Sequence, residues 1–206
     1  MNTETLKEAS NQYLKSMGIT VNKNLPLIEN ISEVKPRSAK DVASRICAIS
    51  YVIGMAYDAD KNKLIKYLKD YNLWSYVSHN EQSLLKNKDI SEQEIIDIEW
   101  LTECSQALAW CLGLVEMDHF KDYDEDLPDK IPIKKDPTEF INNSKLRSIE
   151  EIQSQSDLLY RMHWYTKHIK FYQKSKLNQS IIVERRKAID WVYGTEENWD
   201  EVPLDT

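Results

Sequence analysis

The chain has 206 residues, of which 41% are hydrophobic and 10% aromatic, and its net charge at pH 7 is −7. A disordered chain would be poorer in both residue classes, so we expect one globular, helical domain over residues 1–206. Lysines and arginines alternate with acidic residues and form no basic block, which argues against nucleic acid as a partner. The chain has only four glycines and six prolines, which favours long helices over many turns.

Membrane and export signals are absent from the sequence. The N-terminus, MNTETLKEAS, is polar, and no run of 18 apolar residues follows it. We therefore expect a cytoplasmic protein that does not enter a membrane. Cys47, Cys104 and Cys111 lie within apolar helical patterns, which is typical of free, buried thiols.

Apolar residues recur at three- and four-residue spacing along most of the chain, which predicts an all-α bundle of about seven or eight helices. The first helix is expected over residues 3–17, with Gly18 as its cap. Further helices are expected to begin after the capping residues Ser38, Asp60 and Ser78.

The helix expected at about 92–115 is the most apolar in the chain. Ser91 and Glu94 form a capping box at its start, and its second half is apolar on nearly every side. A helix of this kind is normally buried, so we expect it at the centre of the bundle. Its acidic residues argue against a membrane span.

The C-terminal half begins with a long segment, residues 118–148, that contains three prolines and many acids. It predicts an irregular loop that covers the bundle or is partly mobile. Two helices, at about 149–174 and 180–193, are expected to follow, and then a tail. We expect this tail to dock, with Trp199 buried and Asp200 or Asp205 hydrogen-bonded to the body.

Several charged residues fall on helix faces that normally carry core residues. In the last helix Arg185 lies near the middle of the apolar face, with Glu184 on its flank next to Trp191. In the helix before it, Asp157 and Arg161 share one strip with Trp164 and His168. The residues of the two helices that are expected to face solvent are His163, Lys167, Lys170, Lys174, Arg186, Lys187 and Asp190.

Buried charges are costly unless they are paired, so these groups are expected to satisfy one another. We predict one network of arginines and carboxylates with tryptophans packed around it. Such a network can simply fix the helix register, or it can line a pocket for a small anion or polar ligand. The candidate residues for either role are Glu103, Trp110, Asp157, Arg161, Trp164, His168, Glu184, Arg185, Trp191, Trp199, Asp200 and Asp205.

Familiar motifs of metal and catalytic sites do not match. The acidic run from Asp122 resembles the start of a calcium loop, but Leu127 and Ile133 stand where glycine and glutamate are required. Cys104 and Cys111 lack two further zinc ligands at suitable spacing. Gly-rich phosphate loops and nucleophile elbows do not occur. We therefore predict no metal site and no cofactor, and we assign no catalytic residue.

The C-terminal sequence IVERRKAIDWVYG, followed by NWDEVPLDT, resembles the signature of the bacterial domain-of-unknown-function family numbered 4272. WLTECSQALAWCLG resembles a helix of that family, with Cys104 and Ser105 replacing the usual Ala-Leu after Glu103. ASRICAISYVIGMAY and LRSIEEIQSQSDLLYRMHW extend the resemblance over most of residues 37–206. The resemblance implies a helical bacterial protein with no established activity.

Three functional hypotheses follow. The first is a protein-interaction module, of the inhibitor or immunity type, that binds another protein through its acidic loop and tail. The alternative is a small-ligand-binding protein or enzyme with a pocket formed by the inward-facing Arg/Glu/Trp cluster. A structural subunit of a larger assembly is the third, and an exposed apolar patch would favour it.

Overall fold

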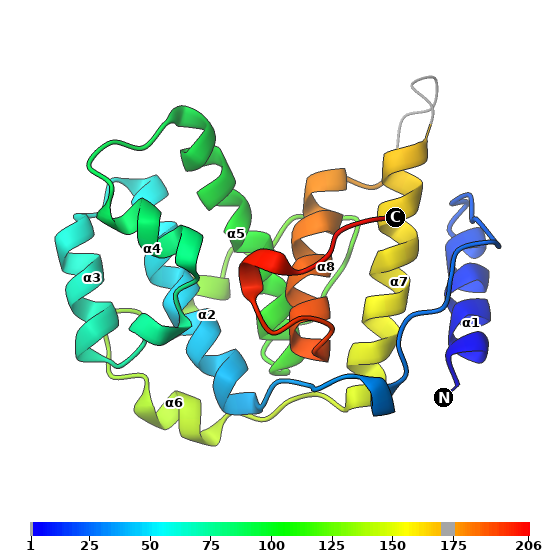
Figure 1. The fold of residues 1–206 in the computed structure, drawn as a ribbon, viewed down its shortest axis with the longest axis horizontal. Helices are drawn as coiled ribbons and strands as arrows, with labels where there is room; N and C mark the ends of the chain where they lie inside the picture. The colour runs from blue at the N-terminus through cyan, green and yellow to red at the C-terminus, as the bar shows by residue number, and fades with distance from the viewer. Residues whose placement is uncertain (1, 170–175) are drawn as a thin grey trace.

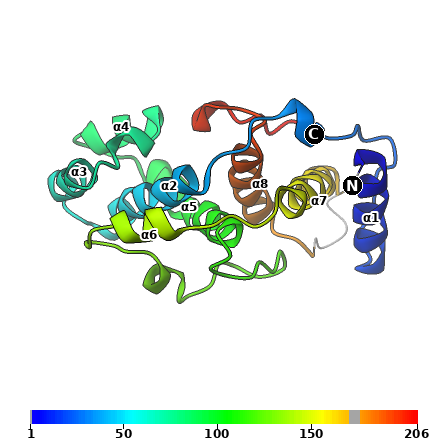
Figure 2. The same ribbon diagram turned by 90° about the horizontal axis from the view of Figure 1, so that it is seen from below.

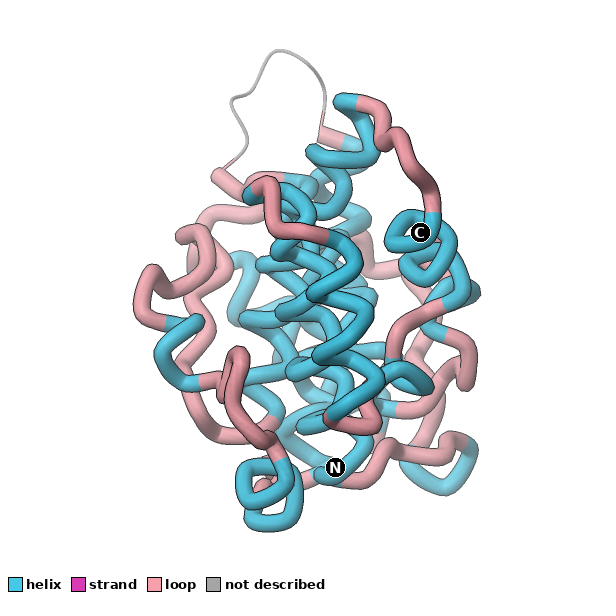
Figure 3. The backbone as a smooth tube through the Cα atoms, turned by 90° about the vertical axis from the view of Figure 1, so that its left-hand side faces the viewer, coloured by secondary structure: helices cyan, strands magenta, loops and turns pink. Residues whose placement is uncertain are grey.

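The computed structural model describes residues 2–169 and 176–206, and within them the chain forms helices and loops but no strand (Figure 3). The predicted all-α fold is therefore confirmed. The α-helices of the described residues are α1 (Thr3–Ser16), α2 (Ala39–Ile53), α3 (Lys61–Asp70), α4 (His79–Lys86), α5 (Glu92–Cys111), α6 (Thr138–Asn143), α7 (Ile149–His168) and α8 (Gln179–Tyr193).

The helices follow one another across the long axis of the molecule (Figure 1). Helices α3 and α4 lie at one end, α2 and α5 come next, and α8, α7 and α1 lead to the other end. Helix α8 packs against both α5 and α7, so these three helices form the middle of the fold. The apolar helix predicted at the centre is α5, and it shares that position with α8.

Capping boxes fix where four of the helices begin. Ser38, Ser78, Ser91 and Ser148 each accept a hydrogen bond from the backbone N–H three residues later, and the acidic side chain at that position caps the serine N–H in return. All four starts agree with the sequence prediction, which places helices after Ser38, Ser78 and Ser91 and from about residue 149. Such starts can be predicted because a capping box depends only on neighbouring residues.

Helix ends and the long loop differ from the prediction. Helix α5 ends at Cys111, before residue 115, because Gly113 adopts a left-handed conformation with φ +69°. Helix α7 ends at His168, and residues 170–174 of the helix expected there lie outside the described residues. The segment 118–148 is mostly irregular, but it contains α6 and the short 3-10 helix η4 (Leu127–Lys130).

Two long connections cover opposite faces of the bundle (Figure 2). The connection between α1 and α2, which includes the 3-10 helix η1 (Ile31–Glu33), lies on one face together with the C-terminal tail. The segment between α5 and α7 lies on the other face. Within residues 2–169 and 176–206, every helix is too short or too polar to span a bilayer.

Candidate functional site

In the described part of the chain, four ion pairs have both side chains buried. Buried charges of this kind are either structural supports or parts of a site, and their remaining hydrogen bonds distinguish the two roles. The four pairs are Arg45–Glu81, Asp157–Arg161, Glu103–Arg185 and Arg186–Asp190.

The Glu103–Arg185 pair joins α5 to α8 and holds the loop after α5. Arg185 Nε donates to Glu103 Oε2 at 2.8 Å, while Nη1 and Nη2 donate to the carbonyls of Asp118 at 2.7 Å and Lys121 at 3.0 Å. Glu103 Oε1 accepts from the backbone N–H of Tyr123 at 3.0 Å. Burial raises the pKa of Glu103, against the lowering effect of Arg185. All three nitrogens of Arg185 are occupied, so this arginine supports the loop.

The Asp157–Arg161 pair lies within α7 and is separate from the first. Arg161 Nε and Nη2 donate to the two carboxylate oxygens of Asp157 at 2.9 and 2.5 Å, and the remaining Nη1 has no partner among the described residues. Glu184 also stands apart, since it accepts from the thiol of Cys104 at 3.2 Å. The groups expected in a single network therefore form independent contacts.

The tryptophans are distributed among different contacts too. The Trp110 ring lies under Arg147, at 4.8 Å from its guanidinium carbon. Trp164 stacks on His168 with ring centroids 5.0 Å apart. Trp191 packs edge-on against Trp199 at 5.4 Å. The described structure therefore shows no common Arg/Glu/Trp cluster, because these residues lie on different sides of α5, α7 and α8.

Arg186, Asp190 and His163 were expected to face solvent, and this prediction is wrong. All three are buried, with exposed fractions of 6%, 5% and 4%. Arg186 Nε donates to Asp190 at 3.0 Å, and Nη1 lies 2.9 Å from both His163 Nδ1 and the Asp205 carbonyl. The tail covers this side of α8, which a helical wheel cannot show.

Two pKa values at this contact are shifted by burial. The pKa of Asp190 is raised to about 6, although Arg186 and a 2.5 Å hydrogen bond from Ser156 Oγ oppose the change. The pKa of His163 is lowered to about 4 by burial and then by Arg186. A polar cavity of about 190 Å³ adjoins these groups, with Tyr160 and the tail residues Pro203 and Asp205 in its lining. Because Arg186 bonds to the tail, its role here is to hold the C-terminus.

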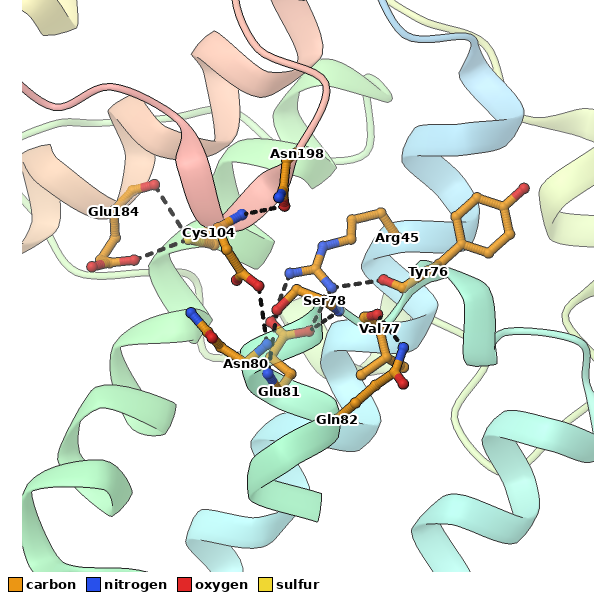
Figure 4. A network of polar contacts seen from close by, with 11 residues as sticks. Arg45, Tyr76, Val77, Ser78, Asn80, Glu81, Gln82, Cys104, Glu184 and Asn198 are labelled. Atoms are coloured by element: carbon orange, nitrogen blue, oxygen red, sulfur yellow. Dashed lines mark hydrogen bonds and ion pairs between the residues drawn. The ribbon is translucent and has the colours of Figure 1, made fainter. Parts of the chain in front are cut away.

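The Arg45–Glu81 pair joins α2 to α4 (Figure 4) and also anchors the tail. The two side chains form a bidentate pair at 2.6 and 2.7 Å, and the Trp199 ring lies 4.0 Å from the Arg45 guanidinium carbon. Asp200 accepts from the backbone N–H of Asn80 at 3.0 Å. Trp199 is only 5% exposed, so the predicted docking of the tail is confirmed.

Sequence reasoning did not include Arg45 and Glu81 among the candidate residues. A signal was present, because Arg45 falls one turn before Ile49 on the buried stripe of α2. Glu81 follows Ser78 by three residues, which is the spacing of a capping box and does not by itself indicate a buried ion pair. Its carboxylate does cap Ser78 at 2.9 Å, and it binds Arg45 as well.

A cleft of about 450 Å³ opens where α5 meets the loop that Arg185 supports. We call it the acidic cleft, because Glu99, Glu103 and Asp122 contribute to its lining. Its walls also carry exposed apolar groups: Tyr57 is 64% and Ile96 45% exposed. The lining residues are Tyr57, Ile96, Glu99, Trp100, Thr102, Glu103, Asp122, Tyr123 and Asn178.

Metal-binding chemistry finds no support in the described residues, where no group of three or more His, Cys, Asp or Glu side chains could hold an ion. Cys47, Cys104 and Cys111 are free and buried, as the sequence predicts. Burial raises the pKa of the Cys104 thiol well above its usual value, so this thiol is a weak nucleophile. The cysteines therefore serve as small apolar core residues.

Comparison with known proteins gives one family and no characterised relative. The model of the family described as "Domain of unknown function (DUF4272)" matches residues 6–202. Among curated proteins and among solved structures, nothing matches the chain. The matched range includes α2 to α8 and nearly all of the C-terminal tail. The chain belongs to the DUF4272 family.

Proposed function

We propose that this protein is a cytoplasmic protein-interaction module, of the inhibitor or immunity type, whose partner binds at the acidic cleft. The observation that carries the proposal is the exposure of Tyr57 and Ile96, at 64% and 45%, on the walls of a cleft that also contains carboxylates. Aromatic and large aliphatic side chains gathered on a surface are typical of binding sites for other proteins.

Charge defines which partner would fit. Glu99 and Asp122 line the cleft, and the adjoining loop carries further acidic residues. The whole chain has a net charge of −7. A partner segment with a lysine or arginine next to an apolar side chain would match both features. The buried arginines contribute little to recognition, because Arg185 is fully occupied by Glu103 and the loop carbonyls.

Affinity capture with matched variants tests this proposal. The test variant is Tyr57→Ser with Ile96→Ser, and the control is Tyr13→Ser, since Tyr13 is 45% exposed on α1 at the far end of the molecule. We expect wild type and control to recover the same partner from native cells, and the test variant to lose it. Equal recovery by the test variant, or no partner at physiological salt, would contradict the proposal.

A substitution at Asp122 tests the contribution of charge to partner binding separately from that of the apolar side chains. Asp122→Asn should weaken capture of the partner, and added salt should weaken wild-type binding in the same direction. Asp129→Asn, in the same loop but outside the cleft lining, is the matched control and should have no effect. If the two variants behave alike, the carboxylate of Asp122 does not contact the partner.

Small-ligand binding is the second candidate, and one observation favours it. Glu103 lines the acidic cleft while burial raises its pKa, and such carboxylates occur in ligand and active sites. A thermal-shift screen of small cations and polar metabolites would test it. The hypothesis expects a compound that stabilises wild type but not Glu103→Gln, and it fails if no compound distinguishes the two.

A further inference from the structure

A second cavity, of about 150 Å³, lies beside the acidic cleft. We call it the α2–α5 cavity. It is partly open to solvent, and its walls are the end of α2, the 3-10 helix η2 (Gly54–Tyr57), α5 and the loop that contains η4. That loop covers this face of the bundle in Figure 2. The lining residues are Ser50, Ile53, Tyr57, Thr102, Ser105, Tyr123, Leu127, Pro128, Ile131 and Ile133.

The chemistry of the lining is mostly hydrocarbon. Five of its residues are isoleucine, leucine or proline, and the only ionisable side chains among the described lining residues are Tyr57 and Tyr123. Burial raises the pKa of Tyr123, which keeps its hydroxyl neutral. A charged ligand would find no opposite charge here and would lose its hydration, so the lining selects a neutral compound.

One polar group in the lining is unsatisfied. Ser50 Oγ donates to the Ile46 carbonyl at 2.8 Å, and Thr102 Oγ1 donates to the Glu99 carbonyl at 2.7 Å. The hydroxyl of Ser105, a residue only 2% exposed, has no hydrogen-bond partner among the described residues. A buried hydroxyl without a partner is costly, so a ligand that bonds to it gains more than it would from an already satisfied group.

The volume of the cavity restricts the size of the ligand that it can hold. Hydrocarbon-lined cavities of roughly 150 Å³ in proteins hold one benzene ring. A ring of that size that also reaches the Ser105 hydroxyl needs a single polar substituent. We propose that the α2–α5 cavity binds a neutral monocyclic aromatic compound with one hydroxyl or carbonyl group, in hydrogen-bond contact with Ser105. The proposal does not rest on partner binding at the acidic cleft, although Tyr57, Thr102 and Tyr123 line both the cleft and the cavity.

Phenol and toluene are suitable probes, because they have nearly the same shape and differ in one hydroxyl. Isothermal titration calorimetry of the purified protein with phenol should give a roughly millimolar dissociation constant. Toluene should bind about tenfold more weakly, since it leaves the Ser105 hydroxyl unsatisfied. Absence of phenol binding at solubility-limited concentrations would overturn the proposal.

Two variants assign the binding to this cavity. Ser105→Ala should bind toluene at least as well as wild type does and should lose the preference for phenol. This variant removes an unsatisfied group, so its melting temperature should not fall. Ile133→Trp should fill the cavity and abolish binding of both probes. A phenol preference that persists in Ser105→Ala, or binding that persists in Ile133→Trp, would place the ligand elsewhere and refute the site.

Discussion

Arg185 contacts two chain segments outside its own helix, because one nitrogen binds Glu103 in α5 and the other two bind the carbonyls of Asp118 and Lys121 in the loop that follows. Arg45 has the same kind of role, since it binds Glu81 and also the carbonyl of Tyr76 at 2.7 Å. An arginine suits this task better than a lysine because its planar guanidinium presents several donors in fixed directions. Each pair therefore fixes a loop as well as two helices.

Removing the charge of Arg185 alone should be strongly destabilising. Arg185→Ala leaves Glu103 buried without its partner, and we expect the free energy of unfolding to fall by about 3–5 kcal/mol. Lys66→Ala is the control, because the Lys66–Asp70 pair is exposed to solvent and should contribute little to stability. Urea denaturation followed by circular dichroism gives both values.

Replacing both members of the pair distinguishes a buried-charge penalty from simple loss of packing. The double variant Glu103→Leu with Arg185→Met leaves no unpaired charge, so it should be more stable than Arg185→Ala. If the double variant is instead the less stable, the loop contacts of Arg185 outweigh the ion pair.

His119 should make the fold sensitive to acid. Burial lowers its pKa from the usual 6.5 to about 4. The folded protein therefore keeps His119 neutral, while the unfolded chain takes up a proton below pH 6.5. The contribution of neutral His119 to the free energy of unfolding is fully present above pH 6.5. It is lost as the pH falls towards 4, and the loss amounts to about 3 kcal/mol.

The matched variant for this prediction is His119→Gln, which can keep the hydrogen bond to Gln155. The difference in free energy of unfolding between wild type and variant should shrink, or change sign in favour of the variant, between pH 6.5 and 4. A constant difference across that range would show that His119 does not titrate differently in the two states. Urea denaturation of both proteins at several pH values measures this difference in free energy of unfolding.

At the level of elements, the end of α8 is closely fitted to the connection before α2. Arg37 N donates to the Val192 carbonyl at 3.0 Å, so the two segments run together. Gly194 ends α8 with φ +89°, and a Cβ atom there would lie 2.1 Å from the Lys35 carbonyl oxygen. Glycine is needed both for the backbone conformation and for this close approach.

Two glycine substitutions separate the cost of the left-handed backbone conformation from the cost of the close approach to Lys35. Gly113 also has a positive φ, +69°, but a Cβ there meets no described atom within 4 Å. Gly113→Ala should therefore cost only the left-handed conformation, about 1 kcal/mol. Gly194→Ala adds overpacking and should cost about 3 kcal/mol in total. Similar melting temperatures for the two variants would mean that the Lys35 segment moves aside easily.

At the level of the whole molecule, the C-terminal tail connects parts that are far apart in the sequence. Trp199 packs on Arg45 of α2 and Trp191 of α8, and Asp200 caps the N–H of Asn80 in α4. The tail therefore bridges the end of the molecule that holds α3 and α4 to the central helices (Figure 1). A bridge of this kind should stabilise the relative positions of these parts.

Trp199→Ala tests this bridge. We expect a loss of roughly 3–5 kcal/mol, because the change empties a buried site beside a buried ion pair. Trp164→Ala is the comparison, since Trp164 is only partly buried and should matter less. Differential scanning calorimetry should show one transition shifted down for Trp199→Ala, and equal shifts for the two variants would contradict the bridging role.

The sequence alone determined most of the helices and their capped starts, the buried apolar helix and the docked tail. These features depend on residues close together in the chain or on strong apolar periodicity, as in the capping boxes at Ser78 and Ser91. The sequence also indicated that inward charges such as Asp157 and Arg185 must be paired, because burial without a partner is too costly.

Only the tertiary structure decided which charge pairs with which. Arg186 and Asp190 look exposed on a helical wheel, but the tail folds over them, and Glu184 contacts Cys104 instead of an arginine. Contacts of this kind join residues far apart in the chain, and helical periodicity carries no information about them. The acidic cleft and the α2–α5 cavity have the same origin, because both form where a loop of irregular sequence meets α5.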